Sequence, residues 1–341
     1  MAARIVGVGK HLPSKVLTNA DLERMVETND EWIVERTGFR ERRIAADDET
    51  TSSLGAEASR MALETAGLTP DDIDLVICAT LSPDGMFPSS ASLIQSGIGA
   101  SRAGAFDINA ACNGFVAALA TGAQFINGGV YERVLVVGSE VTSRIIDWSD
   151  RSTCILFGDG AGAVVLEKAD TGGVGGFVLR SDGNGADLLY ARGPASAPNS
   201  FQQTEGFCIV MDGREVFKFA VRSMEEVTRQ SLALSGLTVE DVTYLLPHQA
   251  NQRIMTALAK GLGMDSERLI SNVDKYGNTS SASIPIALCE AWEEGRLTPG
   301  DHIAITAVGG GLSWGASVLE WTGVGSTLHA KSVAQAVQVS T

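Results

Sequence analysis

A cysteine at position 112 has the surroundings of a reactive thiol. It lies in residues 107–115, which read Asp-Ile-Asn-Ala-Ala-Cys-Asn-Gly-Phe. Apolar residues at 104–108 predict a short buried strand, and the apolar spacing of 114–126 predicts a helix. Because the N–H groups at a helix N-terminus favour an anion, we expect the thiol of Cys112 to lose its proton more easily than in water. An inert cysteine that fills core space is the alternative, since this is the commoner role of a free cysteine.

Two further polar residues stand at the ends of predicted elements. His248 follows the apolar run 244–247, so it emerges at the end of a predicted strand. Asn278 follows a glycine and precedes a predicted helix that Ser or Thr would cap. Taken singly, a histidine at a strand end and an asparagine in a turn are common structural features. They indicate catalysis only if the fold brings them to Cys112.

A run of three glycines, 309–311, is also unusual. Glycines leave their N–H groups bare, so a reacting oxygen could approach them as in an oxyanion hole. A tight turn between the predicted strands 303–308 and 316–321 explains the run equally well. The glycine-rich residues 157–166 imitate a dinucleotide-binding motif only faintly, because a strand and not a helix is predicted after them.

The chain repeats itself at a constant offset. Residues 67–77 resemble residues 236–246, and 236 − 67 = 169. The same offset carries Cys112 to Ser281 and residues 134–137 to 303–306. Together with the alternation of strands and helices, this predicts an α/β fold made of two similar halves. The turn that holds Cys112 then has a counterpart at 278–281, and we expect the two turns to meet in one site.

Composition excludes several classes of function. The net charge of −15 argues against nucleic acid as a partner, because phosphate binding needs a surplus of Lys and Arg. The five cysteines are widely spaced and include no Cys-x-x-Cys pair, which indicates neither a disulfide framework nor a zinc site. The N-terminal residues lack a secretory apolar region, and no apolar run approaches the length of a membrane span. We therefore expect a cytoplasmic protein with no metal and no membrane partner.

Four motifs follow one another along the chain. They read Asp107-Ile-Asn-Ala-Ala-Cys-Asn-Gly-Phe, Pro247-His-Gln-Ala-Asn, Gly277-Asn-Thr-Ser-Ser-Ala-Ser and Gly309-Gly-Gly-Leu-Ser-Trp-Gly. In this order, and with the segment 30–43, they resemble the β-ketoacyl-acyl-carrier-protein synthase III family of the thiolase superfamily. The resemblance covers roughly residues 2–322.

The resemblance implies a thiolase-like fold of class α/β, duplicated in five layers α-β-α-β-α, and a homodimer. The N-terminal half would span 1–170 and hold the nucleophile. The C-terminal half would span 171–322 and hold the histidine and the asparagine, with an extra tail at 323–341.

The activity implied by the resemblance is a decarboxylative Claisen condensation that initiates fatty-acid synthesis. An acyl group from acyl-CoA is loaded on Cys112, and the acyl-enzyme then condenses with malonyl-acyl-carrier protein. The catalytic triad of the family falls on Cys112, His248 and Asn278, and the oxyanion hole on the N–H groups of Cys112 and Gly310. Two neutral donors, His248 and Asn278, suit the stabilisation of an enolate oxygen. No metal or redox cofactor is expected.

Other roles carry over from the family by position. Residues that would bind coenzyme A are Trp32, Arg36, Arg151, Phe217 and Asn251. Phe87 would reach into the acyl pocket of the partner subunit. Carrier protein is acidic, and our candidates for its docking are Arg214, Lys218, Arg253 and Lys260. A solvated surface explains any one of these four cations equally well.

Three residues depart from the usual family pattern at the substrate channel, namely Asn113, Ser152 and Arg214. The departures leave open a specialised condensing enzyme or acyltransferase of secondary metabolism, of the polyketide or quinolone type. A catalytically silent carrier-binding protein is a further alternative, but the intact triad disfavours it. A cysteine hydrolase is disfavoured because the acyl-enzyme must be kept from water.

Overall fold

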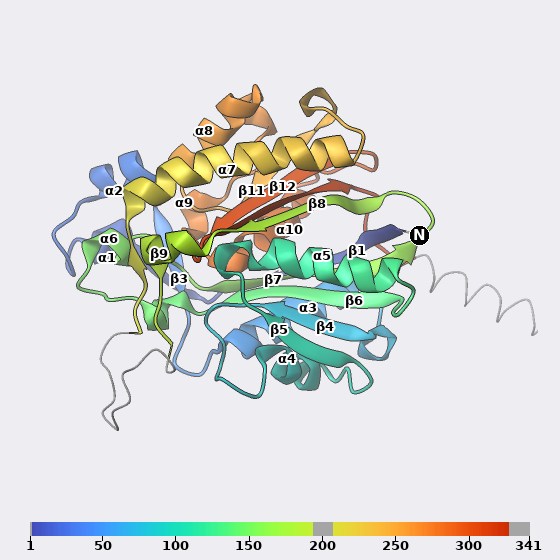
Figure 1. Ribbon diagram of the computed structural model, residues 1–341. Helices are drawn as coiled ribbons and strands as arrows, with labels where there is room; N and C mark the ends of the chain where they lie inside the picture. The colour runs from blue at the N-terminus through green and yellow to red at the C-terminus, as the bar shows by residue number, and fades with distance from the viewer. Residues whose placement is uncertain (1, 194–206, 327–341) are drawn as a thin grey trace, which may run out of the picture.

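The computed structural model describes residues 2–193 and 207–326, and in this part of the chain the main element is a nine-stranded mixed sheet (Figure 1). The strand order is β11-β12-β13-β8-β1-β7-β6-β4-β5. Its strands are β1 (Ala2–His11), β4 (Leu75–Ala79), β5 (Gly104–Ile108), β6 (Arg133–Glu140), β7 (Gly160–Ala169), β8 (Gly173–Ser181), β11 (Tyr244–Pro247), β12 (His302–Gly309) and β13 (Ser313–Glu320). Two short pairs lie outside it, β2 (Lys15–Thr18) with β3 (Glu41–Ile44) and β9 (Leu189–Tyr190) with β10 (Val210–Met211).

The helices follow the same alternation. They are α1 (Asn19–Leu22), α2 (Asp30–Thr37), α3 (Thr51–Ala66), α4 (Ser90–Ile98), α5 (Gly114–Asn127), α6 (Arg151–Cys154), α7 (Gly213–Leu234), α8 (Gln252–Leu262), α9 (Val273–Tyr276) and α10 (Ser283–Glu293). Two 3-10 turns matter for function, η2 (Ala111–Asn113) before α5 and η8 (Ser280–Ala282) before α10.

Side-chain caps fix where the first helices begin. Asn29 caps α2 by accepting a hydrogen bond from the N–H of Trp32 at 2.8 Å, as the sequence predicts. The sequence predicts a helix through Val26 with Asn19 as its cap, and this is wrong. Thr18 is the cap, because the buried Asn19 side chain accepts from Arg42 and donates to the carbonyl of Phe39, and the helix ends at Leu22. The sequence predicts Thr51 or Ser52 as the cap of the helix before Gly67, whereas Thr50 caps α3.

The elements repeat at the offset seen in the sequence. Adding 169 carries β6 (133–140) onto β12 (302–309) and η2 (111–113) onto η8 (280–282). Among the described residues other than glycine, it also relates the two that have a left-handed backbone, Ala111 with φ 48° and Ser280 with φ 50°. This agreement extends to backbone strain, which supports duplication of one folded half.

The halves stack in five layers. Helices α3 and α4 cover the outer face of the strands of the first half, and α7 with α8 cover the outer face of β11, β12, β13 and β8. Helices α5 and α10 lie between the two groups of strands, within one apolar cluster that draws residues from both (Figure 1). The N-termini of the two central helices are thereby placed in the interior of the protein.

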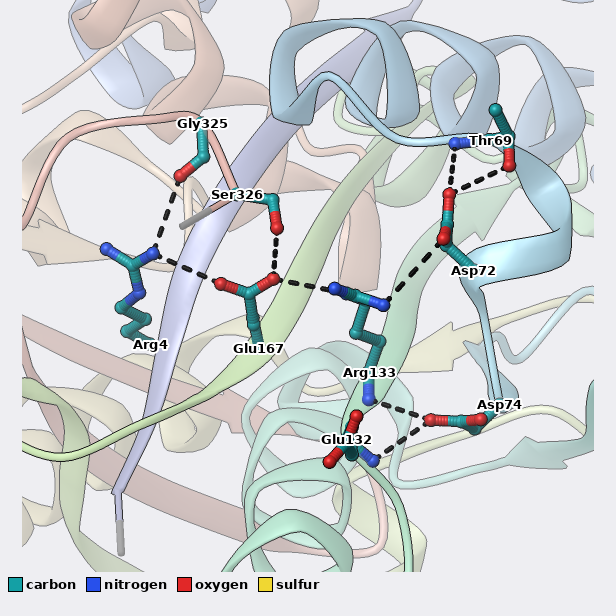
Figure 2. A network of polar contacts seen from close by, with 9 residues as sticks. All are labelled: Arg4, Thr69, Asp72, Asp74, Glu132, Arg133, Glu167, Gly325 and Ser326. Carbon is teal, nitrogen blue, oxygen red and sulfur yellow. Dashed lines mark hydrogen bonds and ion pairs between the residues drawn. The ribbon is translucent and has the colours of Figure 1, made fainter. Parts of the chain in front are cut away.

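A network of charges joins the two ends of the described chain (Figure 2). Glu167 on β7 has no exposed surface and accepts hydrogen bonds from Arg4 on β1 and Arg133 on β6, both at 3.1 Å. The Ser326 hydroxyl donates to the same carboxylate. The main chain of Gly325 also donates to the carbonyl of Val6 at 2.7 Å. The first four residues of the expected tail, 323–326, therefore lie against the core, while 327–341 are outside the described residues.

Glu167→Gln tests how much this network stabilises the fold. Burial raises the pKa of Glu167, but bonds from Ser326, Arg133 and Arg4 outweigh it and leave the pKa below its ordinary value. We expect the variant to lower the free energy of unfolding by about 3 kcal/mol near neutral pH, because two arginines lose their buried partner. The difference from wild type should shrink as pH falls through the native pKa, since the wild-type carboxylate is then also protonated.

Urea unfolding at several pH values measures this effect. The matched control is Glu57→Gln, which breaks the exposed pair with Arg60 in α3 and should cost less than about 1 kcal/mol. Equal losses in the two variants would contradict the importance of the buried network.

Candidate active site

Cys112 lies in η2, at the start of the central helix α5. Its side chain is only 5% exposed, and it faces a cavity of about 1230 Å³. His248, which follows β11, and Asn278, which precedes η8, line the same cavity. The three residues that the sequence assigns to the triad are therefore brought together from both halves of the fold.

The thiol of Cys112 is more strongly desolvated than the sequence indicates. Burial raises its pKa to about 12, although the hydroxyl of Ser280 and the main-chain N–H of Cys112 itself act in the opposite direction. The expectation that the thiol loses its proton easily is therefore wrong. A position at the start of a helix can be read from sequence, whereas complete burial depends on the opposite half of the fold.

His248 is a neutral histidine. Its ring is 2% exposed, and burial lowers its pKa to about 3. Its Nδ1 lies 2.7 Å from the hydroxyl oxygen of Ser283 at the start of α10. A histidine that stays uncharged can donate one hydrogen bond without adding a positive charge to the site.

Asn278 is fixed by its backbone and its side-chain oxygen. Its N–H donates to the carbonyl of Leu156 at 2.9 Å, and its own carbonyl accepts from Gly158 at 3.0 Å. Its Oδ1 accepts from the N–H of Ser280 at 2.8 Å. The amide NH2 is therefore the end of this side chain that can donate to a ligand. The preceding Gly277 has φ 61°, and a Cβ there would lie 2.8 Å from the carbonyl of Leu156.

The glycine run lies against the nucleophile. A Cβ at Gly309 would come within 2.7 Å of the main-chain nitrogen of Cys112, so only glycine allows this approach. Gly310 lines the cavity, and a Cβ there would meet the carbonyl of Leu189 at 2.7 Å. The run ends β12 in a tight turn, as one alternative predicts, and it also borders the site, so the oxyanion hole stays a prediction.

An aromatic and cationic group stands at the outer part of the cavity. The guanidinium of Arg151 lies 4.9 Å from the centre of the Trp32 ring, and that of Arg36 lies 5.9 Å from it. Asn251 caps α8 by accepting from the N–H of Arg253 at 2.8 Å, and its amide donates to the carbonyl of Arg36. Among the residues expected to bind coenzyme A, the cavity is lined by Trp32, Arg36, Phe217 and Asn251. Arg151 is not among the lining residues, but its guanidinium lies over the ring of Trp32, which lines the cavity.

The cations proposed for docking separate into two places. Arg214, Lys218 and Arg253 are exposed and line the cavity, which therefore runs from the buried Cys112 to this surface. Lys260 is in the last turn of α8 and is not among the lining residues. Phe87 is 86% exposed in the loop before α4 and does not line the cavity of its own chain.

Of the three residues that depart from the usual family pattern, two line the cavity and one does not. Ser152 and Arg214 line the cavity, as expected for changes in a substrate channel. Asn113 does not line it. Its Oδ1 lies 3.0 Å from where a Cβ at Gly315 would stand, so the side chain is directed at β13. The expectation that Asn113 touches the channel is wrong, because the turn of η2 directs adjacent side chains to different sides.

Sequence reasoning missed the polar residues that support the site. Ser283 contacts His248, and Glu140 at the end of β6 accepts hydrogen bonds from the hydroxyls of Ser82 and Ser281. Arg42 is buried and donates to the carbonyl of Ile155, beside the segment that pairs with Asn278. An acid at the end of an apolar strand is a weak signal for such a role, and the partners are far apart in sequence.

The part of the chain that the structure describes has neither a metal-binding cluster nor a membrane-spanning helix. Among residues 2–193 and 207–326, no three His, Cys, Asp or Glu side chains are grouped so that they could hold a metal ion. None of the helices described is both long and apolar enough to cross a membrane.

Fold and site together define a class of protein. A buried thiol at a helix N-terminus shares a cavity with a neutral histidine and an asparagine amide, between duplicated halves stacked in five layers. This is the arrangement of an acyl-transferring enzyme of the thiolase superfamily, in which a thiol carries the acyl group and neutral donors stabilise an oxyanion.

Comparison with known proteins narrows the class. Residues 106–183 match the family described as 3-oxoacyl-[acyl-carrier-protein (ACP)] synthase III, and residues 232–321 match its C-terminal part. The chain is 52% identical over 319 residues to the β-ketoacyl-[acyl-carrier-protein] synthase III of Methylococcus capsulatus. The alignment covers 94% of this chain and 99% of that protein. It is 49% identical over 326 residues to the β-ketoacyl-[acyl-carrier-protein] synthase III of Caldanaerobacter subterraneus, and this alignment covers 94% of this chain and 98% of that protein. The crystal structure of 3-oxoacyl-[acyl-carrier-protein] synthase III from Aquifex aeolicus is similar with a TM-score of 0.88 at 48% identity, covering 94% of this chain and all of that one.

The chain belongs to the β-ketoacyl-acyl-carrier-protein synthase III family of condensing acyltransferases. The family and the thiolase-like fold predicted from the sequence are thus confirmed, and so is the enzyme class.

The neutral state of His248 can be tested by titration. Because burial lowers its pKa to about 3, the ring should remain uncharged as pH falls from about 8 to 5. Proton NMR of the ring C–H resonances, assigned by comparison with His248→Ala, measures this directly. A titration midpoint near the ordinary value of 6.5 would contradict the burial described here.

Proposed function

We propose that this chain condenses an acyl group from acyl-CoA with malonyl-acyl-carrier protein, giving β-ketoacyl-carrier protein, CO2 and coenzyme A. The observation that carries the proposal is the meeting of Cys112, His248 and Asn278 at one cavity that opens beside exposed cations. Relatives at about 50% identity over nearly the whole chain are named β-ketoacyl-[acyl-carrier-protein] synthase III, which supports this reaction. Because it starts from acyl-CoA, the reaction would initiate fatty-acid synthesis. The specialised alternative is not favoured.

Loading begins with the sulfur of Cys112. It attacks the thioester carbonyl of acyl-CoA, the new carbon–sulfur bond forms, and the bond to coenzyme A breaks. The thiol proton leaves with the coenzyme A sulfur, which balances the step. The main-chain N–H groups of Cys112 and Gly310 would hold the oxyanion, and the raised pKa of Cys112 indicates that the proton moves as the substrate arrives.

Condensation uses the two neutral donors. The malonyl carbon–carbon bond breaks, CO2 leaves, and the electron pair passes to the thioester oxygen as an enolate. His248 and Asn278 would donate hydrogen bonds to this oxygen. The enolate carbon then attacks the acyl-Cys112 carbonyl and expels the thiolate, which takes a proton from solvent. No electrons leave the reactants, so the reaction as written needs no redox cofactor.

Coenzyme A would enter along the outer part of the cavity. The Trp32 ring and the Arg151 guanidinium offer a flat aromatic and cationic pair for an adenine base, and Arg36 adds positive charge for phosphates. Phe217 and Asn251 line the path between this pair and Cys112.

A homodimer fits the sheet edge. Strand β5 is the last strand of the sheet, so one side of its backbone is available for pairing with another chain. Phe87 and Met86 are strongly exposed in the loop before α4, which packs on β5. A second copy at this edge would cover these apolar side chains. Phe87 of one subunit would then reach into the acyl pocket of the other subunit. We place this dimer in the cytoplasm.

The proposed roles of Cys112, His248 and Asn278 can be tested by measuring the two half-reactions, acyl loading and decarboxylation, separately. Protein mass after incubation with acyl-CoA should rise by one acyl group in wild type and not in Cys112→Ala. The control Cys208→Ala, which removes a half-buried cysteine outside the cavity, should still be acylated. His248→Ala and Asn278→Ala should be acylated as well, yet release CO2 from malonyl-carrier protein at least about 100-fold more slowly, because each removes an enolate donor. Failure of Cys112 to gain an acyl group would overturn the proposed function.

Carrier-protein docking can be tested on one helix. Arg253 lines the cavity from the first turn of α8, whereas Lys260 is seven residues further on, about 10 Å along the axis. Arg253→Glu should raise the KM for malonyl-carrier protein about tenfold, and Lys260→Glu should change it less than about twofold. Steady-state rates at low and moderate salt measure the difference, and a larger effect at Lys260 would place the docking surface elsewhere.

A further inference from the structure

Ser283, the first residue of α10, contacts the catalytic histidine. Its hydroxyl oxygen lies 2.7 Å from Nδ1 of His248 and accepts a hydrogen bond from the main-chain N–H of Gln249 at 3.2 Å. The side chain is only 2% exposed. A serine that touches both the catalytic ring and the next peptide group is placed to control that ring.

The direction of the bond follows from the count of protons. A serine hydroxyl has a single proton and two lone pairs. Gln249 already donates to the oxygen, and the distance to His248 Nδ1 alone fits either direction. If Nδ1 carried the ring proton, the hydroxyl proton of Ser283 would have no acceptor among the hydrogen bonds of the described residues. The arrangement that satisfies both groups therefore has Ser283 donating to Nδ1. A neutral imidazole has one N–H, so with Nδ1 as acceptor the proton of the ring must be on Nε2.

Gln249 cannot easily release the serine. Its side-chain amide donates to the carbonyls of Pro247 and Ile270 at 2.7 and 3.2 Å, and its Oε1 accepts from the N–H of Asn272 at 3.1 Å. These three bonds fix the peptide group whose N–H reaches Ser283. As long as this turn is intact, one lone pair of the Ser283 hydroxyl oxygen is therefore occupied by the N–H of Gln249.

The start of a helix does not by itself require a serine here. The offset of 169 relates Ser283 to Gly114, the first residue of α5, which begins its helix with no side chain. The hydroxyl is thus specific to the half that carries His248.

We propose that Ser283 is a positioning residue that holds His248 as the Nε2–H tautomer, which makes the histidine a hydrogen-bond donor in the cavity and not a base for Cys112. The consequence for catalysis rests on the proposed function, because it assigns the donor to the decarboxylating half-reaction. The tautomer itself does not depend on that function.

The tautomer is observable in the wild-type protein. Histidine labelled with 15N in the ring gives long-range 1H–15N correlations that distinguish a protonated from an unprotonated nitrogen. The chain has four histidines, so His248→Ala identifies the signals of His248. We expect a protonated Nε2 and an unprotonated Nδ1 near neutral pH. A protonated Nδ1 would overturn the proposal even in an active enzyme, whereas an Nε2–H ring in an enzyme that cannot condense would overturn only the proposed function.

Variants test the effect on rate. Ser283→Ala should give a mixture of tautomers and slow CO2 release from malonyl-carrier protein about fivefold, while acyl loading on Cys112 changes less than about twofold. Ser283→Thr keeps the hydroxyl and should restore both the tautomer and the rate. The matched control is Ser59→Ala, which removes a buried hydroxyl that donates to the carbonyl of Gly55 at 2.6 Å inside α3. It should leave both half-reactions unchanged.

Two outcomes count against Ser283. An unchanged tautomer and rate in Ser283→Ala would show that the hydroxyl does not control the ring. Equal slowing of loading and decarboxylation would show general damage to the site. If neither variant at this position folds, the wild-type spectrum still decides the proposal.

Discussion

The structure depends on the contact between the two turns at the starts of α5 and α10. The hydroxyl oxygen of Ser281 in η8 lies 2.8 Å from the carbonyl oxygen of Ala79 and 2.7 Å from the carboxylate of Glu140, both in the opposite half, and its one proton is shared between these two acceptors. A Cβ at Gly138 would lie 2.4 Å from the carbonyl of Ser281, so β6 accepts this turn only because it has a glycine there. Since the nucleophile and Asn278 flank this contact, the packing of one half on the other assembles the site.

This contact is costly by itself. Ala111 and Ser280 have a left-handed backbone that side chains with a Cβ seldom adopt, and Glu140 is fully buried, which raises its pKa. The same burial is useful for chemistry. It keeps His248 neutral. In the proposed reaction it would also strengthen each hydrogen bond to a developing oxyanion and keep water from the acyl-enzyme. The raised pKa of Cys112 is the other consequence of that desolvation.

Much of this architecture could be predicted from the sequence, because its signals are local or periodic. Strands β5 and β11 have the predicted bounds, and the offset of 169 correctly predicts that two turns meet. The contacts of individual side chains between distant residues could not be predicted. The direction of the Asn113 side chain and the bond from Ser281 to Glu140 depend on the opposite half. A residue pattern gives the type of a catalytic side chain, whereas its proton state is set by burial and by neighbours from other elements, such as Ser280 for Cys112 and Ser283 for His248.

Duplication explains why the two halves can divide the chemistry. Each half presents a turn at the N-terminus of a central helix, where unpaired N–H groups favour negative charge. In the first half this position carries a cysteine, and the related position of the second half carries Ser281, which binds Glu140 instead. One related pair of positions thus holds a thiol in the first half and a structural hydroxyl in the second. The neutral state of His248 follows from its burial, which lowers its pKa to about 3. A histidine in that state is suited to donate a hydrogen bond and poorly suited to accept a proton.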